Sequence, residues 1–207
     1  MSADGRRSVA GIVLAAGGSR RFGSPKQTAP FRGRPLIEHA LATLATAPSL
    51  DRRFVVLGAR RAEVIAGADL SSAEQVVCET WRTGQAASLA AGIAAAAGAG
   101  SGAAVVVLAD QPLISSEAIE RVVGAHRADP GADAARALYA GRPGHPVLIS
   151  SSLFGAVEEL SGDLGARELL DRAGVLEVPC DGLGAPVDID TTEALRALEA
   201  ELGQPAG

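Results

Sequence analysis

Lysine is almost absent from this chain of 207 residues. Eighteen of its nineteen basic residues are arginine, and Lys26 is the one lysine. An arginine-for-lysine bias in a chain rich in alanine and glycine is what GC-rich codons produce. That bias accounts for the arginines, but it does not account for the position of the remaining lysine.

The chain also lacks a basic excess, a cysteine framework and a long apolar run. Its net charge of −5 disfavours nucleic acid and anionic membranes as partners. Cys78 and Cys180 lie far apart without a CxxC motif, which predicts small buried side chains in a reducing compartment. The segment 1–7 is polar, and the most apolar stretch, 86–100, is too short to span a bilayer. We therefore expect a cytoplasmic protein.

Apolar runs without alternation lie between segments of helical spacing. Such runs predict strands buried on both faces, and their alternation with helices predicts a parallel sheet. The first half is expected to hold strands at 8–15, 53–58, 74–79 and 103–110, and helices at 35–44, 60–66, 83–97 and 115–127. In the second half we expect strands at 134–140, 146–149 and 175–179, a loop at 141–145, and helices at 152–160, 165–173 and 191–202.

Neither an internal repeat nor a long linker divides the chain. The predicted fold is α/β: a single doubly wound, mostly parallel sheet flanked by helices, in one domain over residues 1–207 with short disordered tails at both ends.

The first predicted strand ends in a glycine-rich turn followed by three cations. Small residues let the backbone approach a ligand, and the exposed N–H groups can face phosphate oxygens. Two common phosphate motifs fail, because Ser19 stands where GxGxxG needs glycine and Ser24 where a P-loop needs lysine. Composition alone leaves open an ordinary turn with solvated arginines. The candidates are the binding residues Leu14, Ala15, Ala16, Gly17, Gly18 and Ser19, and the catalytic cations Arg20, Arg21 and Lys26.

Two acidic positions suit a metal ion. Asp110 closes a predicted strand, and ligands of open α/β sheets bind off the carboxyl ends of strands. Mg²⁺ takes one or two carboxylates together with phosphate oxygens and water. An alternative for Asp110 is a turn cap, since Asp-x-Pro is common in turns. In the segment 188–193, Asp190 has the spacing to Glu193 of a helix cap. Asp188 is the second predicted metal ligand, with Asp190 as the alternative.

The segment Leu14-Ala15-Ala16-Gly17-x-Ser19-x-Arg21-x-Gly23-x-x-Lys26 resembles the signature of nucleotidyltransferases, in particular the branch that attaches CMP or GMP to molybdopterin. Further segments resemble the same family in the same order over about residues 9–198: 30–37, 81–89, 108–112, 141–147, 162–167 and 188–193. Phe22 replaces the usual methionine, and Thr192 and Ala194 depart from the last of these motifs.

The resemblance implies a Rossmann-like, glycosyltransferase-A-like fold and transfer of a nucleotide with release of pyrophosphate. It implies Mg²⁺, or Mn²⁺ in its place, on Asp110. It also places Gly84 and Ser88 beside the nucleotide, and His145 and Asp163 beside the acceptor. Trp81 is expected either on the ligand or over the core, and Asp163 has a helix cap as its alternative.

The favoured substrates by resemblance are CTP and a molybdopterin-type acceptor, with a molybdoenzyme as the partner that receives the product. The alternatives are a GTP-dependent guanylyltransferase, an isoprenoid-pathway cytidylyltransferase, and a non-catalytic nucleotide-binding chaperone for a molybdoenzyme. A nicotinamide-dependent oxidoreductase is disfavoured by the failed GxGxxG motif.

Overall fold

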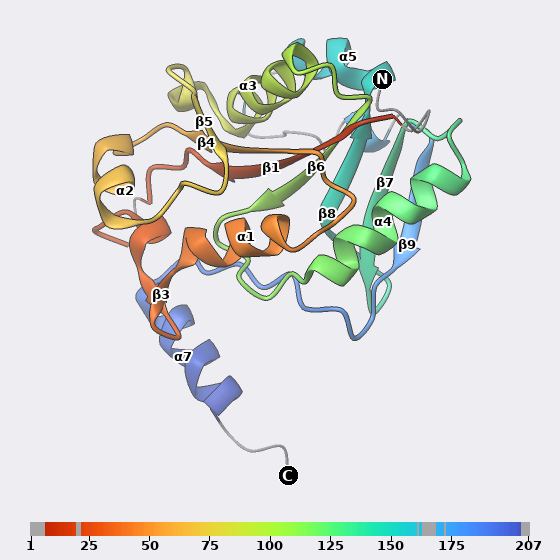
Figure 1. Ribbon diagram of the computed structural model, residues 1–207. Helices are drawn as coiled ribbons and strands as arrows, with labels where there is room; N and C mark the ends of the chain where they lie inside the picture. Colours follow the sequence, from red (N-terminus) through yellow and green to blue (C-terminus); the bar gives the residue numbers. More distant parts are fainter. Residues whose placement is uncertain (1–6, 20–21, 161, 163–168, 172, 204–207) are drawn as a thin grey trace.

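A computed structural model describes residues 7–19, 22–160, 162, 169–171 and 173–203 (Figure 1). The expected disordered tails and most of the expected helix 165–173 lie outside these residues. The described part holds a seven-stranded sheet in the order β5-β4-β1-β6-β8-β7-β9. The bounds are β1 Val9–Ala15, β4 Arg52–Leu57, β5 Glu74–Val77, β6 Ala103–Leu108, β7 Ala134–Tyr139, β8 Arg142–Ser150 and β9 Val175–Pro179.

The sheet is mostly parallel, as the apolar runs predict. β8 alone among these strands runs against its neighbours, since it pairs antiparallel with both β6 and β7. Along β1, Val9 and Val13 face one core while Ala10 and Ile12 face the other. Both faces of the strand are therefore buried, which is why its sequence is apolar throughout and does not alternate.

Helices cover both faces of the sheet (Figure 1). The core on one face includes residues of α1 Leu36–Ala45 and α4 Ser116–Ala128, and that on the other includes residues of α3 Gln85–Gly98 and α5 Phe154–Glu158. The short α2 Arg61–Gly67 follows β4. The alanine-rich α3 approaches the sheet closely: a Cβ added to Gly92 would lie 2.8 Å from Cγ2 of Ile12. No helix in the described ranges is long and apolar enough to cross a membrane.

The predicted loop at 141–145 is wrong, because β8 begins at Arg142. β7 and β8 form a tight hairpin whose turn residues, Ala140 and Gly141, have φ of 50° and 73°. The pairing register shifts between Arg136 and Ala137. Proline and glycine are tolerated in a strand at such irregularities, so a composition typical of loops lies within the sheet.

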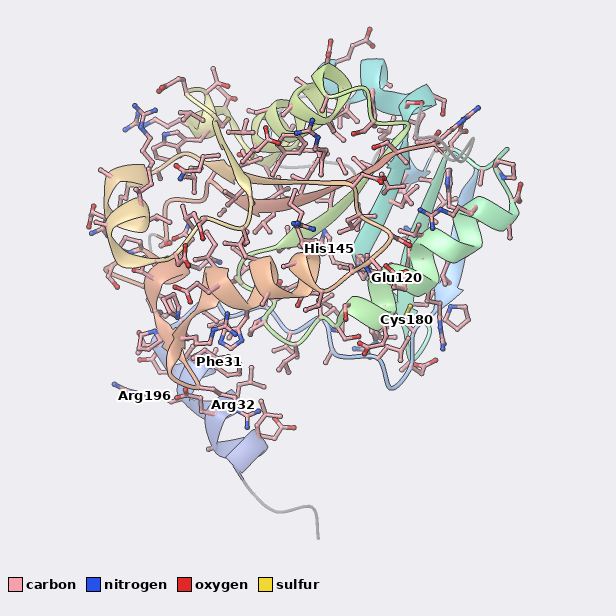
Figure 2. The ribbon with its side chains drawn as sticks, viewed as in Figure 1. Phe31, Arg32, Glu120, His145, Cys180 and Arg196 are labelled. Atoms are coloured by element: carbon pink, nitrogen blue, oxygen red, sulfur yellow. The ribbon has the colours of Figure 1, made fainter. Side chains whose placement is uncertain are left out.

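The predicted helix 152–160 is split into a 3-10 turn, Ser151–Leu153, and α5. A small hairpin, β2 Pro30–Phe31 and β3 Arg34–Pro35, was not predicted. It packs against α7 Thr192–Gly203 through a third apolar cluster in which Phe31 and Ile189 are fully buried. Phe31 and Arg196 lie where the hairpin meets this helix, at the edge of the molecule (Figure 2).

Candidate nucleotide-binding site

A cavity of about 410 Å³ opens where the carboxyl ends of β1 and β6 meet. β1 continues into the glycine-rich turn and β6 leads to Asp110, and β1 pairs with β4 on its other side. The chain leaves β1 toward one side of the sheet, and β6 lies on the other side of β1. Open α/β sheets bind ligands at such a switch point, at the carboxyl ends of the strands. The lining includes most of the nucleotide-binding residues predicted from sequence: Leu14, Ala15, Ala16, Gly17, Gly18, Lys26, Gly84, Ser88 and Asp110.

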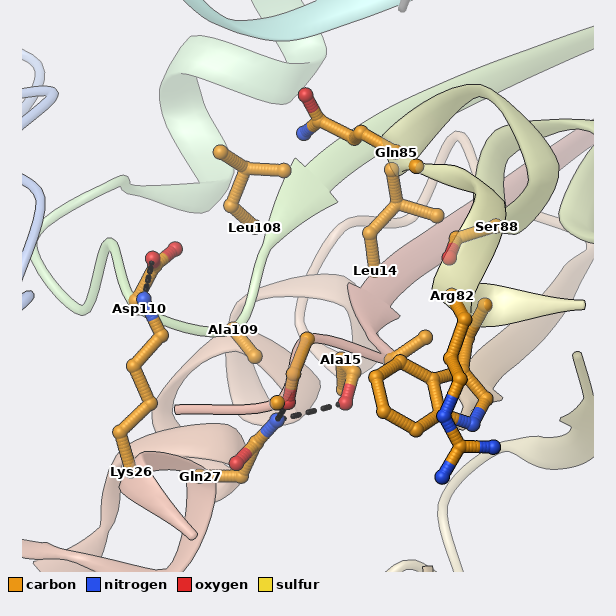
Figure 3. Close-up of a pocket in the computed structure, with 15 residues that line it drawn as sticks. Leu14, Ala15, Lys26, Gln27, Arg82, Gln85, Ser88, Leu108, Ala109 and Asp110 are labelled. Atoms are coloured by element: carbon orange, nitrogen blue, oxygen red, sulfur yellow. Dashed lines mark hydrogen bonds and ion pairs between the residues drawn. The ribbon is translucent and has the colours of Figure 1, made fainter. Parts of the chain in front are cut away.

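Lys26 faces two carboxylates in this cavity. It begins the 3-10 turn Lys26–Thr28, and its ammonium donates to Oδ2 of Asp110 (Figure 3). The same ammonium also donates to Oδ1 of Asp190 over 3.0 Å. Burial by itself lowers the pKa of Lys26, but the charges and hydrogen bonds of the two carboxylates outweigh it and raise the pKa. Lys26 is therefore fully charged at neutral pH.

The helix-cap prediction for Asp190 is wrong. The hydroxyl of Thr191 caps α7 by accepting from the backbone N–H of Ala194 at 3.1 Å. Asp190 contacts Lys26 instead, and its side chain is 44% exposed. The local pattern Asp-x-x-Glu is typical of a helix cap, so it gave no indication of the long-range contact between Asp190 and Lys26.

Asp188 lies close enough to the other two carboxylates to be affected by their charges. Oδ1 of Asp188 accepts from Nε2 of the buried Gln111 at 2.8 Å. Burial raises the pKa of Asp188, and the negative charges of Asp110 and Asp190 raise it further against the opposing effects of Gln111 and Lys26.

This concentration of carboxylate charge suits a cation. Among the residues that the structure describes, Asp110 and Asp190 pair with Lys26, and the charges of both carboxylates act on Asp188. Hard oxygen ligands of this kind are what Mg²⁺ and Mn²⁺ take. Within the described ranges no three acidic, histidine or cysteine side chains form a ready-made metal cluster. One or two carboxylates would fit an ion that completes its coordination with phosphate oxygens and water.

Trp81 forms one wall of the cavity. Its indole packs at the edge of the core, and the guanidinium of Arg82 lies over the indole, 4.5 Å from the ring centroid. Gly58, after β4, permits this packing, because a Cβ there would lie 2.7 Å from Cβ of Trp81. The sequence left two positions open for Trp81, over the core or on the ligand. In the structure Trp81 packs on the core and also lines the cavity.

The predicted residues Gly84 and Ser88 lie at the start of α3. Gly84 has φ of 120°, which the turn into the helix requires, and Ser88 is buried with its hydroxyl 4.0 Å from Sγ of Cys78. The positive end of the helix dipole consequently lies beside the cavity. Cys78 and Cys180 are both free and buried, as predicted.

A second cavity of about 730 Å³ adjoins the first, since Leu14, Gln85 and Leu108 line both. Its wall is largely apolar and includes the predicted residues His145 and Asp188, together with Arg136 and Arg142, which the sequence did not single out. His145 lies on β8, not in a loop, and burial lowers its pKa to about 4 although Asp110 acts in the opposite direction. The imidazole is therefore neutral at pH 7.

Three predicted residues, Arg20, Arg21 and Asp163, lie outside the described residues. Ser19 lies within them and does not line the cavity, but holds the turn by hydrogen bonds to Gln27 and Lys26. The contributions of Gln27, Gln111 and Asp190 were missed, because a buried glutamine has no local sequence signal and Asp190 pairs with a residue 164 positions away.

A glycine-rich turn follows β1, and the lysine after this turn contacts a carboxylate that follows β6. This arrangement defines the class of nucleoside-triphosphate-dependent transferases on an α/β sheet. Residues 11–178 match the family described as the MobA-like NTP transferase domain. The chain belongs to this family and is an enzyme of the nucleotidyltransferase type.

Two curated relatives match nearly the whole chain. Nicotine blue oxidoreductase of Paenarthrobacter nicotinovorans is 35% identical over 92% of this chain and 96% of that protein. The purine catabolism protein PucB of Bacillus subtilis is 32% identical over 88% of this chain and 92% of that protein.

Solved structures agree with the fold. The Rv0371c homologue of Mycobacterium sp. strain JC1 has a TM-score of 0.80 and 32% identity over 94% of this chain and 96% of that one. Rv0371C of Mycobacterium tuberculosis in complex with manganese has a TM-score of 0.76 and 28% identity over 93% and 98%. A CMP:2-keto-3-deoxy-manno-octonic acid synthetase complexed with CTP has a TM-score of 0.75 over 94% and 98%, and its 11% identity extends the likeness to the fold alone.

Proposed function

We propose that this enzyme transfers CMP from CTP to a phosphate-bearing acceptor of the molybdopterin type and releases pyrophosphate. The observation that carries the proposal is the position of Lys26, whose ammonium lies between Asp110 and Asp190 beside the glycine-rich turn. A compact positive charge at this position can stabilise the negative charge that develops on the transferred phosphoryl group in the transition state.

The proposed chemistry needs no general base, because a phosphate monoester is largely ionised at neutral pH. The catalytic task is then positioning and charge stabilisation. Lys26, with Arg20 and Arg21, would neutralise the triphosphate, while the glycine-rich turn would hold it through backbone N–H groups. A divalent ion, Mg²⁺ or Mn²⁺, would be held by Asp110 with Asp188 or Asp190 and would neutralise phosphate oxygens.

The second cavity is the proposed acceptor site. It is larger than the first, mainly apolar, and open to the first beside Leu14 and Leu108. Its neutral His145 can exchange hydrogen bonds without adding charge. Arg142 also lines this cavity and offers a guanidinium to an anionic group, whereas the guanidinium of Arg136 is paired with Glu177 at 2.6 Å. A ring system that bears a phosphate suits this combination, and a molybdoenzyme is the proposed recipient of the product.

The decisive experiment measures pyrophosphate release from CTP, GTP, UTP and ATP, each with Mg²⁺ or Mn²⁺ and candidate phosphate acceptors. Release with CTP and a molybdopterin acceptor supports the proposal. Release with GTP indicates the guanylyl branch, and release with a sugar-alcohol phosphate indicates an isoprenoid-type cytidylyltransferase. Binding of CTP without any release indicates the non-catalytic chaperone.

The Lys26→Ala and Asp110→Ala variants provide the matched test of mechanism. Each is expected to lose about 100-fold or more in kcat, because each removes a charge from the transition state, while the circular dichroism of the folded protein is retained. Near-wild-type rates in either variant contradict the proposed mechanism.

A second candidate is an oxidoreductase, favoured by the name of the relative that is 35% identical over nearly its whole length. Reduction of nicotine blue by NADH or NADPH, followed by absorbance, tests it directly. Turnover that persists in Lys26→Ala would assign the chemistry to other residues and replace the transferase proposal.

A further inference from the structure

Gln27 is the most deeply buried of the seven buried polar or charged residues of the described chain, with 2% of its surface exposed. It follows Lys26 directly and lies in the same 3-10 turn. Burial of an amide is unfavourable unless its donors and acceptor find partners. Its partners therefore indicate what the residue is for.

All hydrogen-bonding groups of the Gln27 amide act on the glycine-rich turn. Nε2 donates to the carbonyl oxygens of Ala15 at 2.8 Å and Gly17 at 3.0 Å (Figure 3). Oε1 accepts from the hydroxyl of Ser19 at 3.1 Å. One side chain thus links the first, third and fifth residues of the segment 15–19.

These contacts fix the orientation of the peptide groups in the glycine-rich turn that would bind a phosphate. In a trans peptide the C=O and the following N–H point in opposite directions. Holding the carbonyls of Ala15 and Gly17 toward Gln27 therefore turns the N–H groups of Ala16 and Gly18 away from it. Ala16 and Gly18 both line the nucleotide cavity.

The same network reaches the catalytic lysine. The hydroxyl of Ser19 accepts from the backbone N–H of Lys26 at 3.0 Å while it donates to Gln27. Ser19 itself has φ of 49°, a left-handed conformation that is uncommon for residues other than glycine and that these hydrogen bonds support. The turn and the backbone of Lys26 are therefore held in one arrangement.

We propose that Gln27 is a positioning residue that sets the amide directions of the phosphate-binding turn and couples this turn to Lys26. It acts through the backbone and Ser19, without touching the reacting atoms. The proposal deepens the proposed function, on which it rests for its catalytic consequence, but its effect on phosphate binding is independent of the acceptor and of turnover.

The test compares Gln27→Met with Thr28→Val. Methionine keeps the length of glutamine and removes its hydrogen bonds, whereas Thr28→Val removes one bond of the neighbouring residue, from Thr28 Oγ1 to the carbonyl of Pro25. Inorganic tripolyphosphate with Mg²⁺ is titrated against the fluorescence of Trp81, the one tryptophan, which lines the same cavity. Gln27→Met is expected to weaken tripolyphosphate binding about 10-fold and Thr28→Val to leave it unchanged.

Turnover supplies the second readout. Misplacement of a reacting group by about 1 Å costs on the order of 100-fold, so kcat of Gln27→Met should fall by about that factor while KM for CTP rises much less. Ser19→Ala, a milder variant of the same network, should show a smaller loss, and the double variant should lose less than the product of the two factors.

Wild-type tripolyphosphate binding in a folded Gln27→Met protein overturns the proposal, as does failure of the wild-type protein to bind tripolyphosphate. If Gln27→Met does not fold, Ser19→Ala decides by the same two readouts. Weakened binding in the variants of a protein that shows no nucleotidyl transfer supports the role of Gln27 and refutes the proposed function.

Discussion

Lys26 has a special place in a chain that uses arginine everywhere else. Its ammonium fits between Asp110 and Asp190 because it is compact and can direct its three N–H donors to separate acceptors. A guanidinium is planar and wider, and its fixed fork suits a single carboxylate better than two from different segments. The site therefore favours lysine at this position for a geometric reason.

Lys26→Arg is the variant that separates charge from shape. It keeps the positive charge, so CTP binding should be largely retained, but kcat should fall about 10-fold or more because the charge centre moves. Steady-state pyrophosphate release measures both quantities, with Lys26→Ala as the reference for complete loss of charge. Full activity in the arginine variant would refute the geometric explanation.

His145 predicts a pH dependence of stability. Burial lowers its pKa in the folded protein to about 4, whereas an exposed histidine in the unfolded chain titrates near 6.5. As pH falls below about 6.5 the unfolded state therefore binds a proton that the folded state does not, and folding stability is lost until about pH 4.

The expected loss from His145 is up to about 1.4 kcal/mol per pH unit. Urea unfolding at pH 7 and pH 5 measures it, and His145→Asn removes the titrating group without a large change in size. The difference in unfolding free energy between the two pH values should be smaller in the variant than in the wild type. An equal difference in both proteins would show that other groups cause the dependence.

Among the elements, the strands were predictable and the hairpins were not. β1 and β6 are buried on both faces, so their continuous apolar runs identify them in the sequence. β8 holds two prolines and a glycine at a register shift, and nothing in its first residues distinguishes it from a loop. Its pairing is decided by its neighbours in space, which a local pattern does not encode.

The residues of the candidate site likewise fall into those that the sequence predicts and those that it does not. The turn 14–19 and Asp110 lie at the ends of predictable strands, and Lys26 follows the turn by a short segment, so sequence and topology together bring them to one crevice. The contact of Asp190 with Lys26, and those of Gln27 and Gln111, depend on segments far apart or on burial. Resemblance to a family can identify such positions, but periodicity and spacing cannot.

α7 supports the acidic segment that precedes it. Thr191 caps the helix, and Ile189, fully buried in the cluster with Phe31, donates its backbone N–H to the carbonyl of Asp110 at 3.0 Å. Asp188 and Asp190 therefore project from a backbone that is fixed at both sides. The cap and the cluster together determine where these two carboxylates lie.

Thr191→Ala should lower the unfolding free energy by about 1 kcal/mol, because it removes the acceptor that caps α7. Thr192→Ala is the matched control, since this neighbouring threonine begins the helix without serving as its cap, and it should change stability by less than about 0.5 kcal/mol. Urea denaturation compares the three proteins. Equal effects of the two substitutions would contradict the assignment of the cap.

For the whole molecule, ligand binding and global stability are linked. A nucleotide that binds only the folded chain adds about 2.7 kcal/mol at 100 times its Kd. For a protein of this size that corresponds to a rise in Tm of roughly 5 to 10 °C. CTP with Mg²⁺ should produce such a shift, and GTP should produce it in place of CTP if the enzyme belongs to the guanylyl branch.

Lys26→Ala is the control for this thermal shift, because loss of the lysine should abolish most of it. NADH provides a second control, and a large shift with NADH alone would favour the oxidoreductase instead. Differential scanning fluorimetry across the four nucleoside triphosphates therefore distinguishes the base and the reaction class without an acceptor.

The contact between Lys26 and Asp190 also has a consequence for biosynthesis. The two residues are 164 positions apart, so the ribosome makes the glycine-rich turn long before it makes Asp190, the second carboxylate that contacts the lysine. Contacts between residues far apart in the sequence form slowly in general, because the entropy of loop closure must be overcome before the contact stabilises the fold. A nascent chain that has completed β1 and β6 can hold the turn and Asp110 together, yet its lysine gains its second acidic partner only after Asp190 has left the exit tunnel. The arrangement of Lys26 between both carboxylates can therefore form only after residue 190 has been made, although the glycine-rich turn and Asp110 are available much earlier.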